Sequence, residues 1–468
     1  MPSFGRFPTG ALSLLLFASV PAYSQTSPSR YQKLAQDLLH ELIEINTTDS
    51  VGDNEEAAQA MADRLLAAGF PTQDVRVLVE APRKGNLVAR LRAADAGKKP
   101  LLLLAHIDVV EAEPADWSVD PFTFLERDGY FYGRGTTDDK AQAAIHVANL
   151  IRLRDEGFEA DRDIIVALTA DEEGGPHNGV QWLLANHRDL IDADLALNEG
   201  GGGTLQDGRR LSNSVQLSEK VYLSFTLEVT NPGGHSSLPR KDNAINTLSL
   251  ALVAIAAHDF PVQLNEVTRA YFSRSAELTA GKLGEAMQAI LADPPDPEAV
   301  RLLATVPAYN ARLRTTCVAT QLDAGHAENA LPQRAQATVN CRILPGVDPA
   351  DIQTTLERVV DDPAVSFTPM QTPTPSEPSP LTRQVLGPIE DITEEMWPGV
   401  PVIPTMSTGA TDGLYLRNAG IPVYGVSGIF GDIDDVRAHG RDERISIRSF
   451  FEGQEFLYRL VKRLSGGS

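Results

Sequence analysis

Two histidines and a series of carboxylates in this sequence stand where apolar segments end, a setting that suits a metal-dependent reaction. His106 and Asp108 follow the apolar run LLLLA at 101–105 and are separated by one residue. Alternate side chains of an extended strand point to the same side, so both groups would face one site. A histidine whose ring is oriented by a carboxylate is a common metal ligand. Taken alone, the pair is more often a strand-end histidine beside a solvated aspartate, so a metal site needs further ligands.

Further candidate ligands stand at the ends of other apolar runs or in glycine-punctuated loops. They are Asp138, Asp139, Glu172, Glu173, Glu199 and His439. Each acid alone is more often a helix cap or a solvent-facing group. With His106 they form a set of oxygen and nitrogen donors without cysteine, which suits two zinc ions that activate a water molecule; manganese or cobalt could substitute. Adjacent carboxylates such as Glu172 and Glu173 could divide proton transfer and metal binding between them.

The segments around these groups alternate between helical and extended patterns. From residue 29 to 197, helical spacing of apolar residues alternates with buried extended runs, which predicts an α/β layered domain. From 215 to 367 the order is β-α-β-α, which predicts a compact second domain inserted into the first. The proline-rich segment 369–380 would lead the chain back to the first domain.

The N-terminus has the pattern of an export signal. Arg6 precedes the apolar run ALSLLLFASV, and Ala22 and Ser24 are small residues at cleavage positions. This run is too short to span a bilayer, and no other segment has the pattern of a transmembrane helix. We therefore expect a secreted or periplasmic protein without stable membrane insertion. The predicted division of the chain is a signal peptide at 1–24, a catalytic domain at 25–214 and 371–468, and an inserted lid or dimerisation domain at 215–370.

The composition narrows the class of partner. A chain of 468 residues, 42% of them hydrophobic, can form a large core and more than one domain. A formal net charge of −22 argues against nucleic acid and anionic membranes as partners, because both carry the same sign of charge.

The sequence contains two cysteines, Cys317 and Cys341, each inside a β-like run. This number is too small for a disulfide-rich scaffold, and a cysteine zinc site is not indicated. An oxidising compartment would permit one disulfide if the two runs pair, but spacing alone does not fix that geometry. A bridge and two free thiols are therefore equally compatible with the sequence.

The ordered motifs along the chain resemble those of the M20 metallopeptidase family, which includes aminoacylase-1 and succinyl-diaminopimelate desuccinylase, and most closely its carboxypeptidase S branch. They are HIDVV, GRGTTDDK, DEEGG, NEGG, GGHSS, ENALPQ, CRILPG, TGATDG and AHGRDE, in the family's order over nearly the whole mature chain. Any one of them could arise by chance, whereas the ordered set is specific. The resemblance implies a zinc-peptidase-like α/β catalytic domain with an inserted α+β lid or dimerisation domain. The GGGG that follows Glu199 replaces the family's usual small-residue or proline motif, which leaves the shape of that loop open.

Matching these motifs position by position implies a role for each candidate residue. The implied metal ligands are His106, Asp138, Glu173, Glu199 and His439. Asp138 would bridge two Zn²⁺ ions; it is assigned in preference to Asp139 because the family ligand is the first acid after Gly-Arg-Gly and two intervening residues. Asp108 would orient His106, and Glu172 would be the general base that takes a proton from the activated water.

The resemblance also assigns three residues of the second domain. His235 in GGHSS corresponds to a histidine that family dimers offer across the subunit boundary to the substrate carbonyl. Asn329 and Arg342 correspond to residues that hold the substrate, and an arginine can bind a terminal carboxylate through two parallel hydrogen bonds. On their own, His235 and Arg342 would be interpreted as an exposed loop histidine and a surface charge. The implied assembly is a homodimer formed through the inserted domain.

Together these assignments predict a carboxypeptidase-like enzyme that cleaves an amide bond next to a C-terminal amino acid carboxylate. An N-acyl-amino-acid amidohydrolase of the same family is the nearest alternative, so the substrate would be a peptide or an N-acyl amino acid. A non-catalytic binding protein would not need Glu172 together with every ligand. A serine hydrolase and a thermolysin-like site are not supported, because the sequence lacks Gly-x-Ser-x-Gly and His-Glu-x-x-His.

Overall fold

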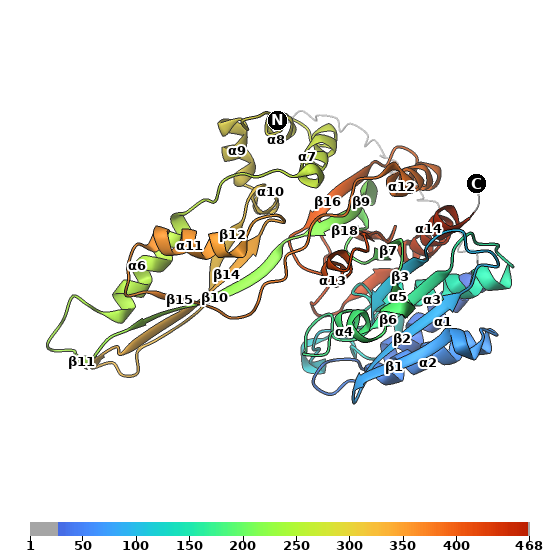
Figure 1. Cartoon of the computed structure of the whole chain (residues 1–468), viewed down its shortest axis with the longest axis horizontal. Helices are drawn as coiled ribbons and strands as arrows, with labels where there is room; N and C mark the ends of the chain where they lie inside the picture. Colours follow the sequence, from blue (N-terminus) through green and yellow to red (C-terminus); the bar gives the residue numbers. More distant parts are fainter. Residues whose placement is uncertain (1–26, 467–468) are drawn as a thin grey trace, which may run out of the picture.

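The structure is a computed structural model that describes residues 27–466. The predicted signal peptide at 1–24 lies outside these residues. Figure 1 shows the predicted catalytic domain, built around a large sheet, and an elongated inserted domain that reaches away from it.

A ten-stranded sheet forms the centre of the catalytic domain, in the order β1-β2-β6-β3-β7-β17-β9-β8-β18, with β16 paired to β9. Its strands are β1 (Val75–Ala81), β2 (Lys84–Leu91), β3 (Leu101–His106), β6 (Ile164–Thr169), β7 (Leu195–Asn198), β8 (Gly203–Gln206), β9 (Arg209–Glu219), β16 (Val402–Ser407), β17 (Val423–Gly425) and β18 (Phe430–Asp432). The strands β6, β3 and β7 are parallel neighbours, so their carboxyl ends meet at one edge of the sheet.

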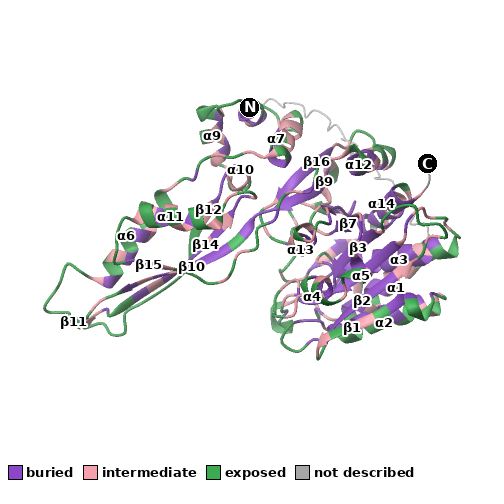
Figure 2. Ribbon diagram, viewed as in Figure 1, coloured by how far each residue is buried: buried purple, intermediate pink, exposed green. Residues whose placement is uncertain are grey.

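Helices cover both faces of this sheet. One layer contains α1 (Arg30–Glu44), α2 (Asn54–Ala67), α3 (Lys140–Asp155), α12 (Arg383–Met396) and α14 (Ile447–Ser465), and the other contains α4 (Gly179–Asn186), α5 (Arg188–Ile191) and α13 (Gly413–Asn418). In β3, Leu101 and Leu103 pack into the first layer, whereas Leu102 and Leu104 pack into the second. A central strand buried on both faces must be apolar throughout, which explains the LLLLA run; Figure 2 shows this burial.

Short elements complete the catalytic domain. They are η1 (Thr72–Asp74), η2 (Pro114–Asp116) and a small sheet of β4 (Leu125–Arg127), β5 (Tyr130–Tyr132) and β19 (Arg444–Ser446).

The inserted domain is an antiparallel sheet with helices on one face, in the order β12-β14-β10-β15. Its elements are β10 (Val221–Thr230), β12 (Thr316–Ala324), β14 (Arg334–Ile343), β15 (Ser366–Pro369), α6 (Ala244–Ala257) and α11 (Pro349–Val360), with β11 (Gly234–His235) paired to β13 (Ala330–Leu331). Alternate residues of β14 are buried against α6 and α11, and the residues between them, including Arg342, lie on the opposite face. Figure 1 shows β11 at the end of the domain that is far from the catalytic sheet.

Four helices between α6 and β12 were absent from the predicted β-α-β-α order. They are α7 (Glu266–Leu278), α8 (Lys282–Ala289), α9 (Pro297–Ala304) and α10 (Pro307–Leu313). They share a small core of their own around Phe272 and Met287. Arg274 of α7 donates a hydrogen bond to the carbonyl of Val402 in β16 (2.7 Å), so this helical unit lies against the catalytic domain.

The prediction of an α/β catalytic domain with an inserted α+β domain is confirmed. The predicted boundary at 215 falls inside β9, which continues in the large sheet to Glu219, and the chain enters the second sheet at Val221. The last strand of the inserted domain ends at Pro369, beside the predicted return at 371. None of the helices between residues 27 and 466 combines the length and the apolarity needed to cross a membrane.

Cys317 and Cys341 form a disulfide, one of the two alternatives that the sequence left open. The two residues face each other on the neighbouring strands β12 and β14. The disulfide therefore links the edge strand of the inserted sheet covalently to its neighbour.

Candidate active site

The predicted metal ligands lie together at one edge of the large sheet. His106 is the last residue of β3, Glu173 follows β6, and Glu199 follows β7 directly. Because these three strands are parallel neighbours, their side chains converge although they are far apart in the sequence. Asp138, just before α3, and His439, in the loop before β19, approach from the connecting segments.

Asp138 lies between the two histidines. One of its carboxylate oxygens is 2.9 Å from His106 Nε2, and the other is 3.1 Å from His439 Nε2. His439 Nε2 is also 2.8 Å from Glu173 Oε1, and His106 Nε2 is 4.0 Å from Glu199 Oε2. The five predicted ligands therefore form one continuous cluster with Asp138 at its centre.

Two groups in this cluster have ligand atoms close enough to hold a metal ion. The first is His106, Asp138 and Glu173, and the second is His106, Glu172 and Glu199, with all ligand atoms of a group within 4.8 Å of one another. The second group contains Glu172, which the sequence analysis made the general base, so this carboxylate lies at the metal site itself. Imidazole nitrogens and carboxylate oxygens are the donors that zinc accepts. The residues present therefore fit a pair of divalent metal ions.

The electrostatics of the cluster also favour cations. Burial raises the pKa of Glu172 and of Glu199, and nearby carboxylates add to both shifts. Burial alone would raise the pKa of Asp138 as well, but its hydrogen bonds with His106 and His439 outweigh that effect and lower it. The hydrogen bond with Asp138 raises the pKa of His439 to about 9. So many half-buried acids at one point become stable anions only when positive charge is beside them.

Asp108 differs from its predicted role in one respect. The atom nearest to His106 Nδ1 is the backbone carbonyl oxygen of Asp108, at 3.0 Å, whereas the Asp108 carboxylate is 3.6 Å away. That carboxylate instead accepts a hydrogen bond from the backbone N–H of Glu173 (2.9 Å). Asp108 therefore orients the ring through its main chain and fixes the Glu173 loop through its side chain.

Glu443 holds two loops of the site together, a role that the sequence analysis did not assign. Its carboxylate is fully buried and accepts hydrogen bonds from the Arg134 side chain (2.7 Å), the Gly135 N–H (3.2 Å) and Thr137, through both its N–H (2.7 Å) and its hydroxyl (2.8 Å). All of these donors lie in the loop that leads to Asp138, while Glu443 stands in the loop of His439. The only sequence signal was its position four residues after His439.

A second unassigned network supports the loop that carries Glu172. Buried Lys84 forms ion pairs with Asp171 (2.6 Å) and Asp49 (2.7 Å). Asn178 donates hydrogen bonds to the Asp171 carbonyl (3.2 Å) and to buried Asp412 (2.5 Å), which belongs to the TGATDG motif. Burial raises the pKa of Asp412 to about 7. Nothing in the local sequence around Lys84 marks it as part of the site.

The three predicted residues of the inserted domain do not join this cluster in the single chain. His235 and Asn329 lie together at the far tip, where Asn329 O accepts a hydrogen bond from Ser236 N (3.0 Å). Arg342 lies at the other end of β14, paired with Tyr222. Eight residues of extended strand separate the two ends of β14, which corresponds to about 26 Å. Asn329 and Arg342 of one chain therefore cannot hold the same carboxylate.

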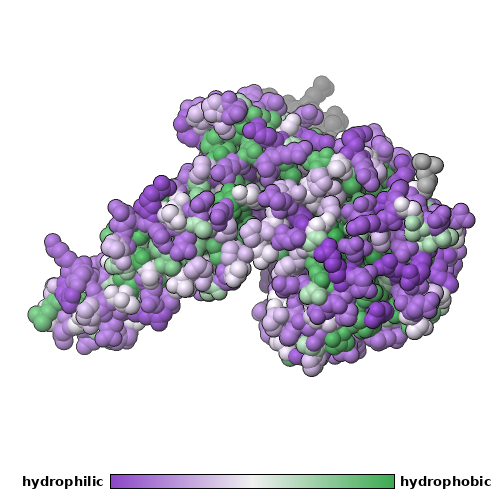
Figure 3. All heavy atoms as spheres, in the orientation of Figure 1, coloured by the Kyte–Doolittle hydropathy of each residue, from purple (hydrophilic) through white to green (hydrophobic). Residues whose placement is uncertain are grey.

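The structure has a cavity beside His439 of the cluster and a second cavity at the junction of the two domains. One of about 580 Å³ is lined by His439, Trp117 and Arg134, and one of about 230 Å³ lies at the junction of the two domains. Figure 3 shows that the surface is hollowed where the domains meet.

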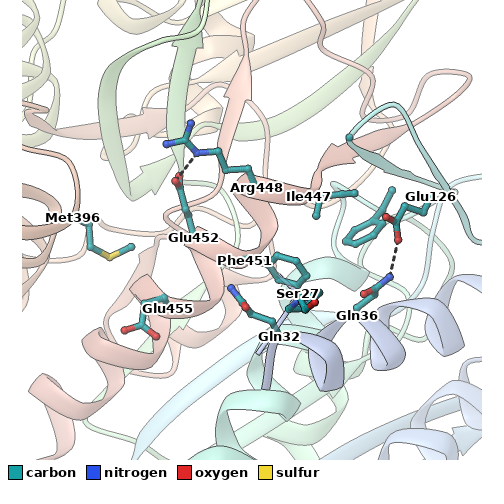
Figure 4. A pocket seen from close by; sticks show the side chains of 13 residues that line it. Ser27, Gln32, Gln36, Glu126, Met396, Ile447, Arg448, Phe451, Glu452 and Glu455 are labelled. Atoms are coloured by element: carbon teal, nitrogen blue, oxygen red, sulfur yellow. Dashed lines mark hydrogen bonds and ion pairs between the residues drawn. The ribbon is translucent and has the colours of Figure 1, made fainter. Parts of the chain in front are cut away.

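A cavity of about 720 Å³ lies elsewhere, between α1, the small sheet and α14 (Figure 4). None of the candidate residues lines it, and its polar side chains pair with one another, as Gln36 does with Glu126 and Arg448 with Glu452. This cavity is therefore not part of the candidate active site.

Comparison with known proteins places this arrangement in a family. The model of peptidase family M20/M25/M40 matches residues 102–463. A probable carboxypeptidase S-like 2 of Dictyostelium discoideum is 29% identical over 92% of this chain and 84% of its own length. The N-fatty-acyl-amino acid synthase/hydrolase PM20D1 of Homo sapiens is 28% identical over 97% of this chain and 93% of its own.

A solved structure has the same fold. The M20 family metallo-carboxypeptidase Sso-CP2 of Sulfolobus solfataricus aligns with 92% of this chain and 99% of its own, with a TM-score of 0.69 and 19% identity. The family match spans every candidate metal ligand, from His106 to His439. The chain therefore belongs to peptidase family M20/M25/M40 and is an enzyme, a metallohydrolase.

Proposed function

We propose that this metallohydrolase cleaves an amide bond next to the free carboxylate of a C-terminal amino acid, with two zinc ions in the cluster. The observation that carries the proposal is Asp138, whose two oxygens lie 2.9 Å from His106 Nε2 and 3.1 Å from His439 Nε2. A carboxylate between two imidazoles is suited to bridge a metal pair. When bound, the ions would polarise the amide carbonyl and lower the pKa of the attacking water.

Glu172 is the proposed general base. Its carboxylate lies in the group formed with His106 and Glu199, so it is within reach of a water held at that group. It would take a proton from this water and return the proton to the departing amine. Glu173 differs from it, because its carboxylate is bound to His439 and its N–H to Asp108.

Arg342 is proposed to hold the free carboxylate of the substrate. Its guanidinium lies over the Tyr222 ring, 4.5 Å from the centroid, on the face of the inserted sheet that the helices leave uncovered. Its contact with Asn340 is a long one (3.4 Å), and no ion pair of Arg342 is formed within residues 27–466, so its donors remain free for a carboxylate.

His235 and Asn329 are proposed to act from a second copy of the chain. Both lie at the exposed tip of the inserted domain, distant from the cluster of their own chain (Figure 1). Because the pairing of β11 with β13 holds them together, a partner subunit would deliver both to the same substrate, where His235 could stabilise the developing oxyanion. Arg342 would come from the chain that provides the cluster.

Hydrolysis of N-acyl amino acids is a second candidate. It is favoured by the similarity over 97% of this chain to a protein described as an N-fatty-acyl-amino acid synthase/hydrolase. Both candidates share the carboxylate, the metal pair and the base, and differ only in the group on the other side of the amide.

A substrate panel tests both candidates. Zinc-reconstituted protein would be given a dipeptide, an N-acetyl and a long-chain N-acyl derivative of one amino acid, each with a free carboxylate and as the matched methyl ester. We expect release of the amino acid from the free acids and much slower release from the esters, because Arg342 recognises the carboxylate. Equal rates for acids and esters would contradict the proposal, and the ratio among the acyl groups decides between the candidates.

We also propose that the protein is exported after cleavage of residues 1–24. The Cys317–Cys341 disulfide supports this, because such bridges persist in oxidising compartments. The mature N-terminus of protein recovered from the medium or periplasm should be Gln25. Retention of residues 1–24 in cytoplasmic protein would contradict the proposal.

A further inference from the structure

A small pocket lies at the junction of the catalytic and inserted domains. Its volume is about 230 Å³, below the roughly 300–1,000 Å³ of pockets that take a whole drug-sized ligand, so it has room for one side chain. Its walls are formed by residues 219–222 at the start of the inserted domain, residues 371–376 on the return segment, and Ala410, Leu414 and Tyr415 from the segment around the start of α13.

Two walls of the pocket belong to segments that contact the proposed carboxylate site and the loop of the proposed base. Tyr222 forms one wall, and the Arg342 guanidinium lies over its ring at 4.5 Å. Tyr415 forms another wall, three residues after buried Asp412, which Asn178 connects to the loop of Glu172. Burial raises the pKa of the Tyr415 phenol, and the charges of Asp412 and Glu172 add to that shift, which agrees with this proximity.

The charged groups at the pocket are satisfied by the protein itself. Glu219 is paired with Arg417 (2.5 Å) and accepts hydrogen bonds from Thr411 (2.8 Å) and Gln216 (3.1 Å). Lys220 donates to the carbonyl of Arg314 (2.7 Å) and more weakly to Thr316 (3.3 Å).

The surface that remains for a ligand is neutral and largely apolar. It consists of the rings of Tyr222 and Tyr415 with Val221, Ala410 and Leu414, and of the uncharged polar residues Gln371, Thr372, Thr374 and Ser376. Burial also lowers the pKa of Lys220 to about 7, and its amine is already bonded to Arg314 and Thr316. An apolar or aromatic side chain is the complement of such walls, and a charged side chain would lose its hydration there without gaining a partner.

We propose that this pocket receives the side chain of the amino acid whose carboxylate Arg342 binds, and that it selects apolar and aromatic residues. This inference rests on the proposed function, because it concerns the leaving amino acid of that reaction. It identifies Leu414 and Tyr222 as specificity-determining residues and the preferred substrates as amides of leucine- or phenylalanine-like amino acids.

The test varies the pocket and the side chain together. Wild-type protein, Leu414→Trp and Leu414→Ala would be compared on one acyl group joined to glycine, leucine, phenylalanine, tryptophan and aspartate. Leu414→Trp fills the pocket and should lower kcat/KM for phenylalanine at least about tenfold while changing the glycine substrate little. Leu414→Ala enlarges it and should move the preference towards tryptophan. Leu278→Trp, an exposed position on α7, is the matched control and should leave the ratios unchanged.

Binding of the free amino acids provides a readout that does not need turnover. Phenylalanine should bind wild-type protein more tightly than glycine in calorimetry, and Leu414→Trp should abolish that difference. If no amide is hydrolysed but this binding pattern holds, the proposed function fails and the pocket assignment stands. The assignment is overturned if wild-type protein does not prefer phenylalanine to glycine and aspartate, or if folded Leu414 variants keep the wild-type ratios.

Discussion

The metal cluster and the tip of the inserted domain carry the same kinds of residue but are built in opposite ways. In the cluster, His106 is 2% exposed and is held by groups that come from distant parts of the chain. At the tip, His235 is exposed, and its ring nitrogen is bonded only to Ser237, two residues away. The cluster is therefore assembled within one folded chain, whereas the tip presents a histidine that has no site of its own.

This difference shows which part of the reaction each region can control. Buried ligands fixed by long-range contacts can set metal geometry in advance, because their partners do not move independently. An exposed tip fixed by its own turn can act only when something brings it to a cluster. Metal binding should therefore be a property of the single chain, and turnover a property of the assembly.

Metal removal should have the largest effect. Prolonged chelation should abolish hydrolysis, since the cluster then contains only carboxylates and imidazoles. Metal analysis should find about two divalent ions per chain in the active protein. Readdition of zinc should restore activity, with manganese and cobalt as comparisons. Full activity in metal-free protein would break the assignment of the cluster.

The neighbours Glu172 and Glu173 should respond differently to the same change. Glu172→Gln should lower kcat by about two to four orders of magnitude, because an amide cannot accept the proton, while most of the metal stays bound. Glu173→Gln should mainly weaken metal binding, because Glu173 Oε1 lies 2.8 Å from His439 Nε2. Metal content and kcat would be measured on the same preparations. Equal metal loss in both variants would refute this division of roles.

The variant His235→Ala tests whether the tip of the inserted domain takes part in catalysis. Turnover should fall by about two to three orders of magnitude, the effect of removing one oxyanion donor, while fold and metal content are unchanged. Mixing this variant with Glu172→Gln under subunit exchange should restore activity, because one site of each heterodimer then combines an intact base with an intact His235. An inactive mixture that contains demonstrated heterodimers, or a strictly monomeric active enzyme, would favour domain closure within one chain.

Glu443→Gln tests how far the cluster depends on long-range contacts. Its carboxylate is fully buried and connects the loops of Asp138 and His439, so we expect metal affinity to fall about 10- to 100-fold. Asp74→Asn is the control, since Asp74 is also a buried acid paired with an arginine, Arg92, but ends η1 directly before the edge strand β1. The control should lower stability without changing metal affinity. Equal affinity losses in both variants would mean that Glu443 acts only through stability.

The sequence could predict the cluster because strand ends leave a local mark. An apolar run followed by His106 or Glu199 is visible in the sequence, and parallel packing then brings such ends together. The donor types suggested the metal pair and a division of work between Glu172 and Glu173, and the resemblance assigned each residue its role. These assignments stay predictions.

Other parts of the site have no local signal. The bonds of Glu443 cross 306 to 309 residues of sequence, and Lys84 reaches Asp171 across 87, so neither follows from spacing. Helices α8, α9 and α10 have eight residues or fewer and bury few side chains each, so their patterns are weak. The separation of Arg342 from Asn329 depends on the course of β14, which no motif encodes.

Removal of the disulfide should have the smallest effect on the reaction. It changes the inserted domain alone, and so tests whether the metal cluster is independent of that domain. Cys317 and Cys341 are 24 positions apart in the sequence, so the bridge closes a loop of that length in the unfolded chain. Without the bridge, the free energy of unfolding should fall by about 3 kcal/mol. The bridge lies in the inserted sheet and touches no ligand of the cluster, so metal content should not change and kcat should stay within about twofold. Thermal unfolding of the Cys317→Ala/Cys341→Ala variant would be compared with wild-type protein in the presence and absence of reductant. Reductant should destabilise the wild type alone, because the variant has no bridge to lose. Loss of metal from the variant would show that the cluster and the inserted domain are coupled within one chain, and the two regions would then have to be treated as a single unit.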